Sequence, residues 1–277
     1  MTPKKVHAIY FSPTHSSKQI AESIVRGTGV ATVETTDLTL QSVPSREIPL
    51  DEPVVIAVPV YGGKVAPLAL ERLDAISSQG APVVIVVVYG NRAYEQALTE
   101  LDRFVTSRGF NVIGAATFIG EHSYSNANYP VSAGRPDARD NELAYAFGRR
   151  IIEKINSAQA YEQLYPVDPA KIKRPKQPFF TLIRFARKAM EFRKKGLLVP
   201  VYPVNDPGKC IHCGKCVKNC PAGAIPADNE LVTLTDKCIK CCACVKVCPE
   251  QARTFNSAFS ILLSEYFKKQ KEPQVLL

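Results

Sequence analysis

The chain has 277 residues, enough for one large domain or two small ones, and its 45% hydrophobic and 22% charged residues exclude a disordered or fibrous protein. Lys and Arg number 35 against 26 Asp and Glu, which gives a formal charge of +9. A charge of this size suggests an acidic partner: nucleic acid, an anionic membrane or an acidic protein.

The N-terminal residues, M-T-P-K-K-V-H-A-I-Y-F-S, carry two lysines and a short apolar stretch that contains a histidine. They predict a first strand and not a signal peptide. No apolar run approaches the roughly 20 residues that a membrane-spanning helix needs. We therefore expect no transmembrane segment and a cytoplasmic protein, in which clustered cysteines bind metal more often than they form disulfides.

The first 160 residues alternate between apolar runs and segments of helical spacing. Continuous Val and Ile runs are typical of strands that helices cover on both faces of a parallel sheet. The predicted strands lie at 6–11, 32–38, 54–60, 83–89 and 112–119, and the predicted helices at 17–26, 67–77, 94–108 and 140–158. This order predicts an α/β domain with a doubly wound parallel sheet of five strands.

Residues 161–205 differ in composition, with recurrent proline and ten basic against three acidic residues. Within them, the apolar residues from Phe179 to Met190 follow helical spacing, beside a row of Arg and Lys. We predict a basic connector with one amphipathic helix, and we expect the apolar residues of that helix to pack between two domains.

The last part of the chain contains a repeat with an offset of 28 residues. K-C-I-H-C-G-K-C-V-K-N-C-P-A-G-A begins at Lys209, and K-C-I-K-C-C-A-C-V-K-V-C-P-E-Q-A begins at Lys237. Ten of the sixteen aligned positions are identical, which indicates a duplicated unit. All nine cysteines of the chain lie in these two stretches.

Each repeat has the spacing C-x2-C-x2-C-x3-C-P, which is typical of four-iron clusters and in which the fourth cysteine ligates the other cluster. The expected ligands are therefore Cys210, Cys213, Cys216 and Cys248 for one [4Fe–4S] cluster, and Cys238, Cys241, Cys244 and Cys220 for the second. A disulfide framework or a zinc site fits two such tight runs poorly. Cys242, the ninth cysteine, is expected to be a small buried thiol, with a spare ligand or a labile thiol as alternatives.

Residues 206–255 closely resemble bacterial-type two-cluster ferredoxins. The resemblance implies a small fold of two short β-ribbons and two helical turns that encloses both clusters. It also implies one-electron transfer at low potential.

The loop after the first strand, F-S-P-T-H-S-S-K, can wrap a phosphate with hydroxyl groups, backbone N–H groups and a helix N-terminus. It resembles the phosphate loop of flavodoxins, with His15 at the usual glycine; histidine is among the residues that tolerate positive φ. The loops P-V-Y-G-G-K and Y-G-N-R follow two later strands at the same edge of the sheet, where flavodoxins bind the flavin ring. No Rossmann or Walker motif is present.

These loops predict FMN, with a degenerate domain that lacks the cofactor as the alternative. Tyr61 is expected to stack on the flavin, Asn91 to bond its polar edge, and His122 and Tyr124 to lie at the same rim. The predicted FMN-binding residues are Ser12, Thr14, His15, Ser16, Ser17, Pro59, Tyr61, Gly62, Gly63, Tyr89, Gly90, Asn91 and His122.

The whole chain resembles a flavodoxin–ferredoxin fusion family. The predicted domains are a flavodoxin-like FMN domain at 1–160, the connector at 161–205, and a two-cluster ferredoxin domain with a C-terminal helix at 206–277. The resemblance implies electron transfer between FMN and the clusters in one polypeptide. The alternative is a flavin-dependent reductase that its clusters supply with electrons; no catalytic residue is assigned.

The expected partner is a redox protein, which could be acidic. Nucleic-acid or membrane binding through the basic helix is the least favoured class of function, and no nucleic-acid partner is predicted. Cluster thiolates and the FMN phosphate would remove most of the +9 and leave the positive charge in the connector.

Overall fold

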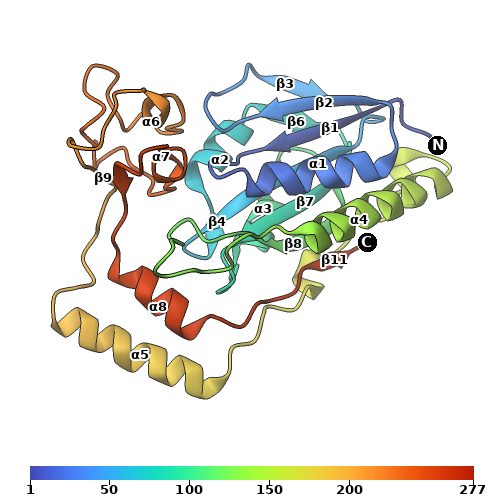
Figure 1. The fold of residues 1–277 in the computed structure, drawn as a ribbon. Coiled ribbons are helices and arrows are strands. Elements are labelled where there is room, and N and C mark those ends of the chain that lie inside the picture. Colours follow the sequence, from blue (N-terminus) through green and yellow to red (C-terminus); the bar gives the residue numbers. More distant parts are fainter. The chain divides into compact units, whose positions relative to one another are not determined.

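The Val- and Ile-rich runs form the centre of a parallel sheet in the computed structural model, which describes residues 1–277 (Figure 1). Its parallel strands are β2 (Thr32–Asp37), β1 (Lys5–Tyr10), β4 (Val54–Tyr61), β7 (Pro82–Tyr89) and β8 (Asn111–Ile119), in this spatial order. Every residue of β7, which lies between β4 and β8, is buried. Numbered along the chain, the order is 2-1-3-4-5, that of flavodoxin-like sheets, which confirms the predicted fold class.

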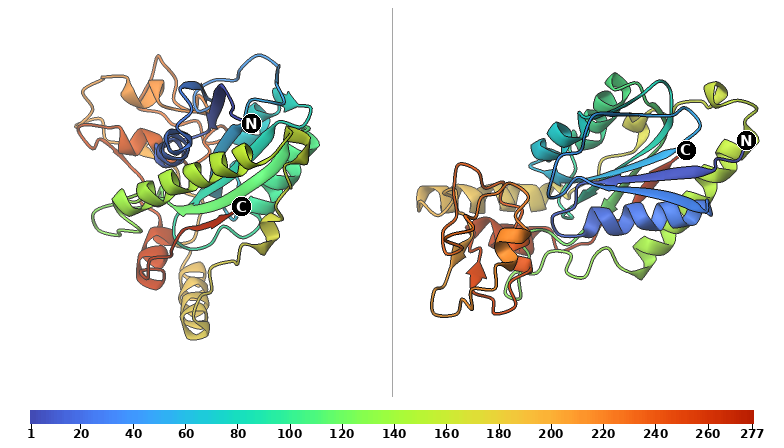
Figure 2. Two further views of the ribbon diagram at one scale, coloured as in Figure 1. Left: turned by 90° about the vertical axis from the view of Figure 1, so that its right-hand side faces the viewer. Right: turned by 90° about the horizontal axis from the view of Figure 1, so that it is seen from above.

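Helices cover both faces of this sheet. α1 (Ser16–Thr28) and α4 (Ala138–Ser157) pack together on one face, while α2 (Pro67–Leu73) and α3 (Ala97–Ser107) lie on the other (Figure 2). The division follows from right-handed crossovers, because α1 leads from β1 to β2 in one direction along the sheet and α3 leads from β7 to β8 in the other.

The structure adds short strands that the sequence patterns do not separate. The predicted helix at 67–77 ends at Leu73, and β6 (Ile76–Ser78) pairs in parallel with β3 (Arg46–Ile48). β5 (Lys64–Val65) forms a hairpin with β4. β11 (Gln274–Leu276), at the end of the chain, lies antiparallel to β8 as an edge strand.

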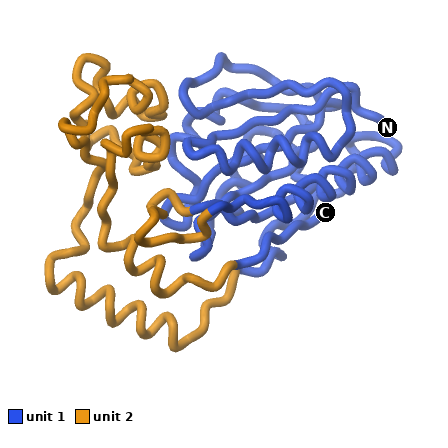
Figure 3. The backbone as a smooth tube through the Cα atoms, in the orientation of Figure 1, with its two compact units in different colours: residues 1–121, 134–174, 271–277 blue, residues 122–133, 175–270 orange.

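The chain divides into two units (Figure 3). Unit 1 comprises 1–121, 134–174 and 271–277, and unit 2 comprises 122–133 and 175–270. These boundaries differ from the predicted ranges in three places, and one of them is the predicted connector 161–205, which is divided between the units after residue 174. The C-terminal residues belong to unit 1 through β11, and the segment 122–133, between β8 and α4, belongs to unit 2.

Unit 2 contains the cysteine repeats and two longer helices. Each repeat has one short helix, α6 (Lys215–Lys218) or α7 (Ala243–Lys246), and a ribbon of β9 (Val204–Asn205) and β10 (Arg253–Thr254) joins the two ends of this region. The predicted amphipathic helix is α5 (Phe179–Lys194), and it packs against α8 (Ala258–Tyr266).

Within unit 2, α5 packs through two of its large apolar side chains, and the expected packing between the domains stays a prediction. Phe185 contacts the rings of Phe259, Tyr266 and Phe267 at centroid distances of 5.2–6.5 Å, and Phe192 is buried. The other large apolar side chains of this helix are exposed to solvent. None of the helices is long and apolar enough to cross a membrane.

Two glycines allow α1 and α4 to approach closely in unit 1. A Cβ atom on Gly148 would lie 2.0 Å from the carbonyl oxygen of Ile24, and one on Gly27 would lie 2.0 Å from that of Tyr145. Both neighbours are backbone atoms of the facing helix, so neither can move aside cheaply. Helix propensity alone marks these glycines as weak helix formers, whereas the close packing of the two helices requires them.

Gly148→Ala is therefore expected to push α4 away from α1 and to lower the free energy of unfolding by about 2–3 kcal/mol. The midpoint of thermal unfolding, followed by circular dichroism, should fall by about 5 °C or more. Gly208→Ala is the control, because its new Cβ atom would meet its nearest neighbour at an ordinary 3.4 Å. Equal midpoints for the two variants would contradict this account of the helix pair.

Candidate functional site

The eight predicted cluster ligands line two separate pockets of unit 2. One pocket is bordered by Cys210, Cys213, Cys216 and Cys248, and the other by Cys220, Cys238, Cys241 and Cys244. In each pocket the fourth cysteine of one repeat lies with the first three of the other. No disulfide forms, since all nine cysteines are free thiols.

The two repeats have the same backbone conformation around these pockets. His212 (φ 54°) and Gly214 (φ 67°) of the first repeat correspond to Lys240 (φ 57°) and Cys242 (φ 58°) of the second. In the second repeat, this conformation directs the N–H of Lys240 to the Cys238 thiol. Cys242 is 1% exposed and lines the second pocket, as a small buried thiol would.

Burial disfavours ionisation of several of these thiols. It raises the pKa of Cys241 and of Cys244 to about 12, and it raises the pKa of Cys242 further. Thiols must be deprotonated before they ligate a metal, and a nearby cation supplies the opposing charge. The protein alone favours protonated thiols in these pockets. The iron ions of an iron–sulfur cluster would supply the positive charge that favours thiolates, so the cysteine pockets fit such a cluster.

A buried arginine supplies further positive charge to the cysteine region. Arg253 is 1% exposed and borders the first pocket. Its guanidinium donates to three uncharged oxygens, the Thr233 hydroxyl and the backbone carbonyls of Glu230 and Val232. The Glu230 carboxylate pairs with His212 instead, at 2.6 Å.

A buried guanidinium without an ion-pair partner is costly unless another negative group lies close. Arg253 also acts on the thiols of the second pocket, since its charge opposes the rise in the pKa of Cys238 and Cys244. Clusters held by thiolates in both pockets would compensate this buried charge. The repeat pattern alone does not single out Arg253, because the residue lies after the last cysteine.

The candidate phosphate loop in unit 1 has positive φ at the position where such loops usually carry glycine. His15, which stands at the usual glycine of such loops, adopts φ 67° as the N-cap of α1. Ser12 closes the loop: its hydroxyl accepts from Lys18 N at 2.9 Å, and its N–H donates to the Thr39 hydroxyl at 2.9 Å. The N–H groups of the first turn of α1 thus face the loop without intrahelical acceptors, as an anion site needs.

Two residues that the sequence patterns miss lie against this loop or the segment beside it. Arg72, on α2, is buried and donates to the carbonyl oxygens of Leu38 and Thr39. Gly120 lies close to the loop, because a Cβ atom there would meet the Ser16 side chain at 3.1 Å. Their roles depend on contacts between segments far apart in the chain.

The loops after β4 and β7 carry the other candidate FMN residues. Pro59 and Tyr61 are half-buried at the end of β4, and Gly62 (φ 61°) and Gly63 (φ 84°) form the tight turn to β5. Positive φ at both central residues explains the glycines. Because a Cβ atom on Gly62 would meet no atom within 4 Å, the backbone here is open to a ligand.

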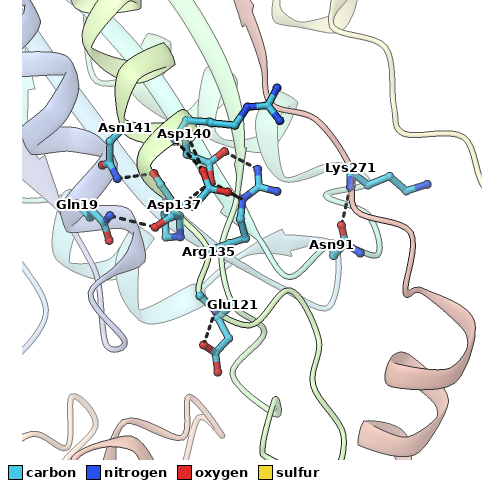
Figure 4. A network of polar contacts seen from close by, with 11 residues as sticks. Gln19, Asn91, Glu121, Arg135, Asp137, Asp140, Asn141 and Lys271 are labelled. Carbon is cyan, nitrogen blue, oxygen red and sulfur yellow. Dashed lines mark hydrogen bonds and ion pairs between the residues drawn. The ribbon is translucent and has the colours of Figure 1, made fainter.

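Tyr89 and Asn91 have roles in the interior of unit 1. Tyr89 is 2% exposed, burial raises its pKa, and its ring packs on Tyr94 at 5.5 Å. Asn91 is fully buried, and its Oδ1 accepts a hydrogen bond from Lys271 N at 2.8 Å (Figure 4). The side chains of both residues are thus used within the fold, while Gly90 between them remains half-buried.

His122 and Tyr124 belong to unit 2, whereas the other candidate FMN residues belong to unit 1. His122 Nδ1 accepts from Tyr124 N at 3.0 Å, and the two rings lie 4.9 Å apart. Tyr124 in turn packs on Phe255 at 4.5 Å. Burial, together with the thiols of Cys242, Cys238 and Cys241, raises the pKa of Tyr124 to about 12.

A polar network anchors the ends of the segment 122–133 in unit 1 (Figure 4). Glu121 N donates to Arg135 O at 2.8 Å, and Gly134 N donates to a Glu121 carboxylate oxygen at 3.2 Å. Arg135 forms a buried ion pair with Asp140, which also takes part in the capping box of α4. The chain therefore leaves and re-enters unit 1 at one point, two residues beyond the end of β8.

Residues 202–249 match a family described as 4Fe-4S dicluster domain. No curated protein matches the sequence.

Among solved structures, a flavodoxin from the domain Archaea is 15% identical, with a TM-score of 0.36, over 55% of this chain and 99% of its own. A Streptococcus pneumonia TIGR4 flavodoxin is 16% identical, with a TM-score of 0.39, over 54% of this chain and 99% of its own. Rubredoxin oxygen:oxidoreductase from Desulfovibrio gigas is 15% identical, with a TM-score of 0.39, over 57% of this chain; the match spans 38% of that protein. The strand order, and not these distant matches, assigns the fold of unit 1.

The arrangement of the cysteines predicts different outcomes for two double substitutions. Cys216→Ala/Cys248→Ala removes two cysteines from one pocket, so the reconstituted protein should fall from about eight to about four irons. Cys216→Ala/Cys220→Ala removes one cysteine from each pocket and should eliminate both clusters. Iron and sulfide analysis checks this result. Cys242→Gly, which gives the second repeat the residue of the first, is the control and should keep all iron. Equal iron contents in the two double variants would contradict the exchange of the fourth cysteines between the two ligand sets.

Arg253→Gln is expected to lower the reduction potential of the bound clusters, because the lost positive charge favoured the reduced, more negative state. Reduction at a fixed ambient potential should become about tenfold less favourable, which equals about 59 mV for one electron. A redox titration followed by electron paramagnetic resonance measures this. Arg253→Lys should retain most of the wild-type potential. Lys237→Gln removes an exposed charge next to Cys238 and should have a much smaller effect, because water screens it.

Proposed function

We propose that this chain, which combines a flavodoxin-like domain with a 4Fe-4S dicluster domain, transfers electrons between FMN and two [4Fe–4S] clusters within one polypeptide. The fold of unit 1 and the cysteine pockets of unit 2 support a flavin and iron–sulfur redox protein. Bound FMN would supply two-electron chemistry that passes through one-electron steps, and each cluster would supply one-electron chemistry.

One observation carries the proposal: the chain is tied to unit 2 at the edge of the sheet where flavodoxin-like proteins bind their flavin. Of the four places where the chain passes between the units, two adjoin Glu121 and Gly134, just beyond β8. A third is Lys271, which Asn91 holds two residues beyond β7. The carboxyl ends of β7 and β8 share one edge of the sheet, because the two strands are parallel.

The length of the connecting chain makes this tie short. Five residues lead from Ile119, the last residue of β8, to Tyr124, and the next residue, Ser125, accepts a hydrogen bond at its carbonyl oxygen from Lys246 Nζ of the second repeat at 2.9 Å. An extended chain of five residues spans roughly 18 Å at most. This limit does not depend on the orientation of the two units, and it favours electron transfer inside the chain over transfer between molecules.

The proposed FMN site uses residues of unit 1 with defined tasks. The first turn of α1, with Thr14, His15, Ser16 and Ser17, would bind the phosphate, and Ser12 would keep the loop closed. Tyr61 and the Gly62–Gly63 turn would border the flavin ring, together with the backbone at Gly90. Tyr89 and Asn91 would support this site from the interior.

The reductase alternative has less support. His122 and Tyr124 are the candidates for proton transfer to a substrate, yet His122 Nδ1 already accepts a hydrogen bond and the Tyr124 ring packs on Phe255. Turnover with small-molecule acceptors, compared with transfer to a protein acceptor, distinguishes the two functions.

The surface around Cys213 suits an acidic redox partner protein. Cys213 is exposed, unlike the other cluster cysteines, and Ile211 beside it is 59% exposed. Lys209 is exposed in the same loop, and Lys215 and Lys218 are exposed on α6, which follows it. An acidic protein that docks on these lysines would place its own redox centre near the first cluster.

The proposal is tested by anaerobic reconstitution followed by rapid reduction. We expect about eight irons and one FMN per chain. After rapid reduction, one kind of centre should be oxidised while the other is reduced, at a rate that does not change with protein concentration. A rate proportional to protein concentration would show transfer between molecules and contradict the proposal. The Cys216→Ala/Cys220→Ala variant, with its flavin retained, is the control and should show no such transfer.

A further inference from the structure

The helix α5 exposes an unusual number of large apolar side chains. Phe179 is 70% exposed, Phe180 77%, Met190 57%, Leu182 42% and Ile183 40%. We call these five residues the α5 surface. Monomeric proteins seldom leave neighbouring large apolar groups in water unless the patch binds something.

Most of the α5 surface lies on a different side of the helix from the residues that hold it in unit 2; the exception is Leu182, about 60° around the axis from Phe185. Phe185 packs on the rings of Phe259 and Phe267, and Phe192, seven positions further along and on the same side, is buried. Residues 179, 183 and 190 share one side of a helix with 3.6 residues per turn, more than 100° around the axis from Phe185 and Phe192. The contact with α8 therefore does not need the α5 surface, which can bind a partner without rearrangement.

Positive charge surrounds this surface. From 169 to 190 the chain contains seven Lys or Arg residues and neither Asp nor Glu. Glu191 is the only acidic residue of α5, and Lys188 and Lys195 pair with it at 3.0 and 2.7 Å. Arg184, Arg187, Arg193 and Lys194 are exposed on the same helix.

We propose that α5 binds the surface of an anionic lipid bilayer, lying in the plane of the membrane with its exposed apolar side chains among the acyl chains. A helix that combines exposed Phe, Leu, Ile and Met with Arg and Lys suits this interface, which offers hydrocarbon and anionic headgroups side by side. An acidic protein surface would pair with the cations, but its carboxylates would not cover the five apolar side chains, which have no hydrogen-bonding groups. The 16 residues of α5 span roughly 24 Å and include too many charges to cross the bilayer.

The test uses the full-length reconstituted protein and sedimentation with vesicles of phosphatidylcholine, with and without phosphatidylglycerol. We expect binding only with phosphatidylglycerol, weakened by salt. Phe179→Ser/Phe180→Ser should abolish it, and Arg184→Gln/Arg187→Gln should weaken it about fivefold for each cation removed. Leu40→Ser, at an apolar residue 52% exposed in unit 1, and Arg149→Gln/Arg150→Gln, at exposed arginines of α4, are the matched controls and should bind as the wild type does.

Three results would overturn the proposal. The first is a lack of binding to the anionic vesicles. The second is binding that survives Phe179→Ser/Phe180→Ser. The third is that the α5 surface binds protein and no vesicles. This would appear as dimers that depend on concentration, or as a complex with an acidic protein, and Phe179→Ser/Phe180→Ser would abolish either one. Because the substituted side chains are exposed, iron and flavin contents should stay unchanged in every variant, which separates this outcome from a failure of the redox function.

Discussion

Parallel strands all end at the same edge of a sheet, and the organisation of this protein depends on that edge. The loops after β1, β4 and β7 meet there and form the candidate flavin site. The chain also passes between its two units there, beside Glu121 and at Lys271. A single geometric property of the sheet therefore fixes both the binding loops and the attachment of the cysteine-containing unit.

Buried charge is the second constraint, and it acts in unit 2. The thiols of Cys241 and Cys244 are shielded from water, which by itself keeps them protonated, and the guanidinium of Arg253 is buried without an ion-pair partner. Each of these features is unfavourable alone. Clusters with cationic iron and anionic thiolates in the two pockets would offset both, so the surroundings that disfavour free thiolates would favour bound clusters.

The excess of positive charge in the composition has a local explanation. The connector carries ten basic and three acidic residues, and much of this charge lies on and before α5. Its exposed cations adjoin exposed Phe, Leu, Ile and Met side chains, which a dissolved acidic partner does not require. Charge and apolar exposure on one helix thus point to an anionic lipid surface, whereas the lysines near Cys213 form the proposed docking surface for a redox protein.

The sequence by itself determined the class of the fold and the chemistry of the cysteines, because both depend on short-range patterns. Buried parallel strands appear as continuous Val and Ile runs, and the ferredoxin-type spacing repeats within a few residues. Only the tertiary structure decided which unit the segment 122–133 joins, that β11 pairs with β8, and that Gly27 and Gly148 bring two helices together. These features, like the burial of Arg253 and the exposure of Phe179, depend on contacts between residues far apart in the chain, which local spacing does not encode.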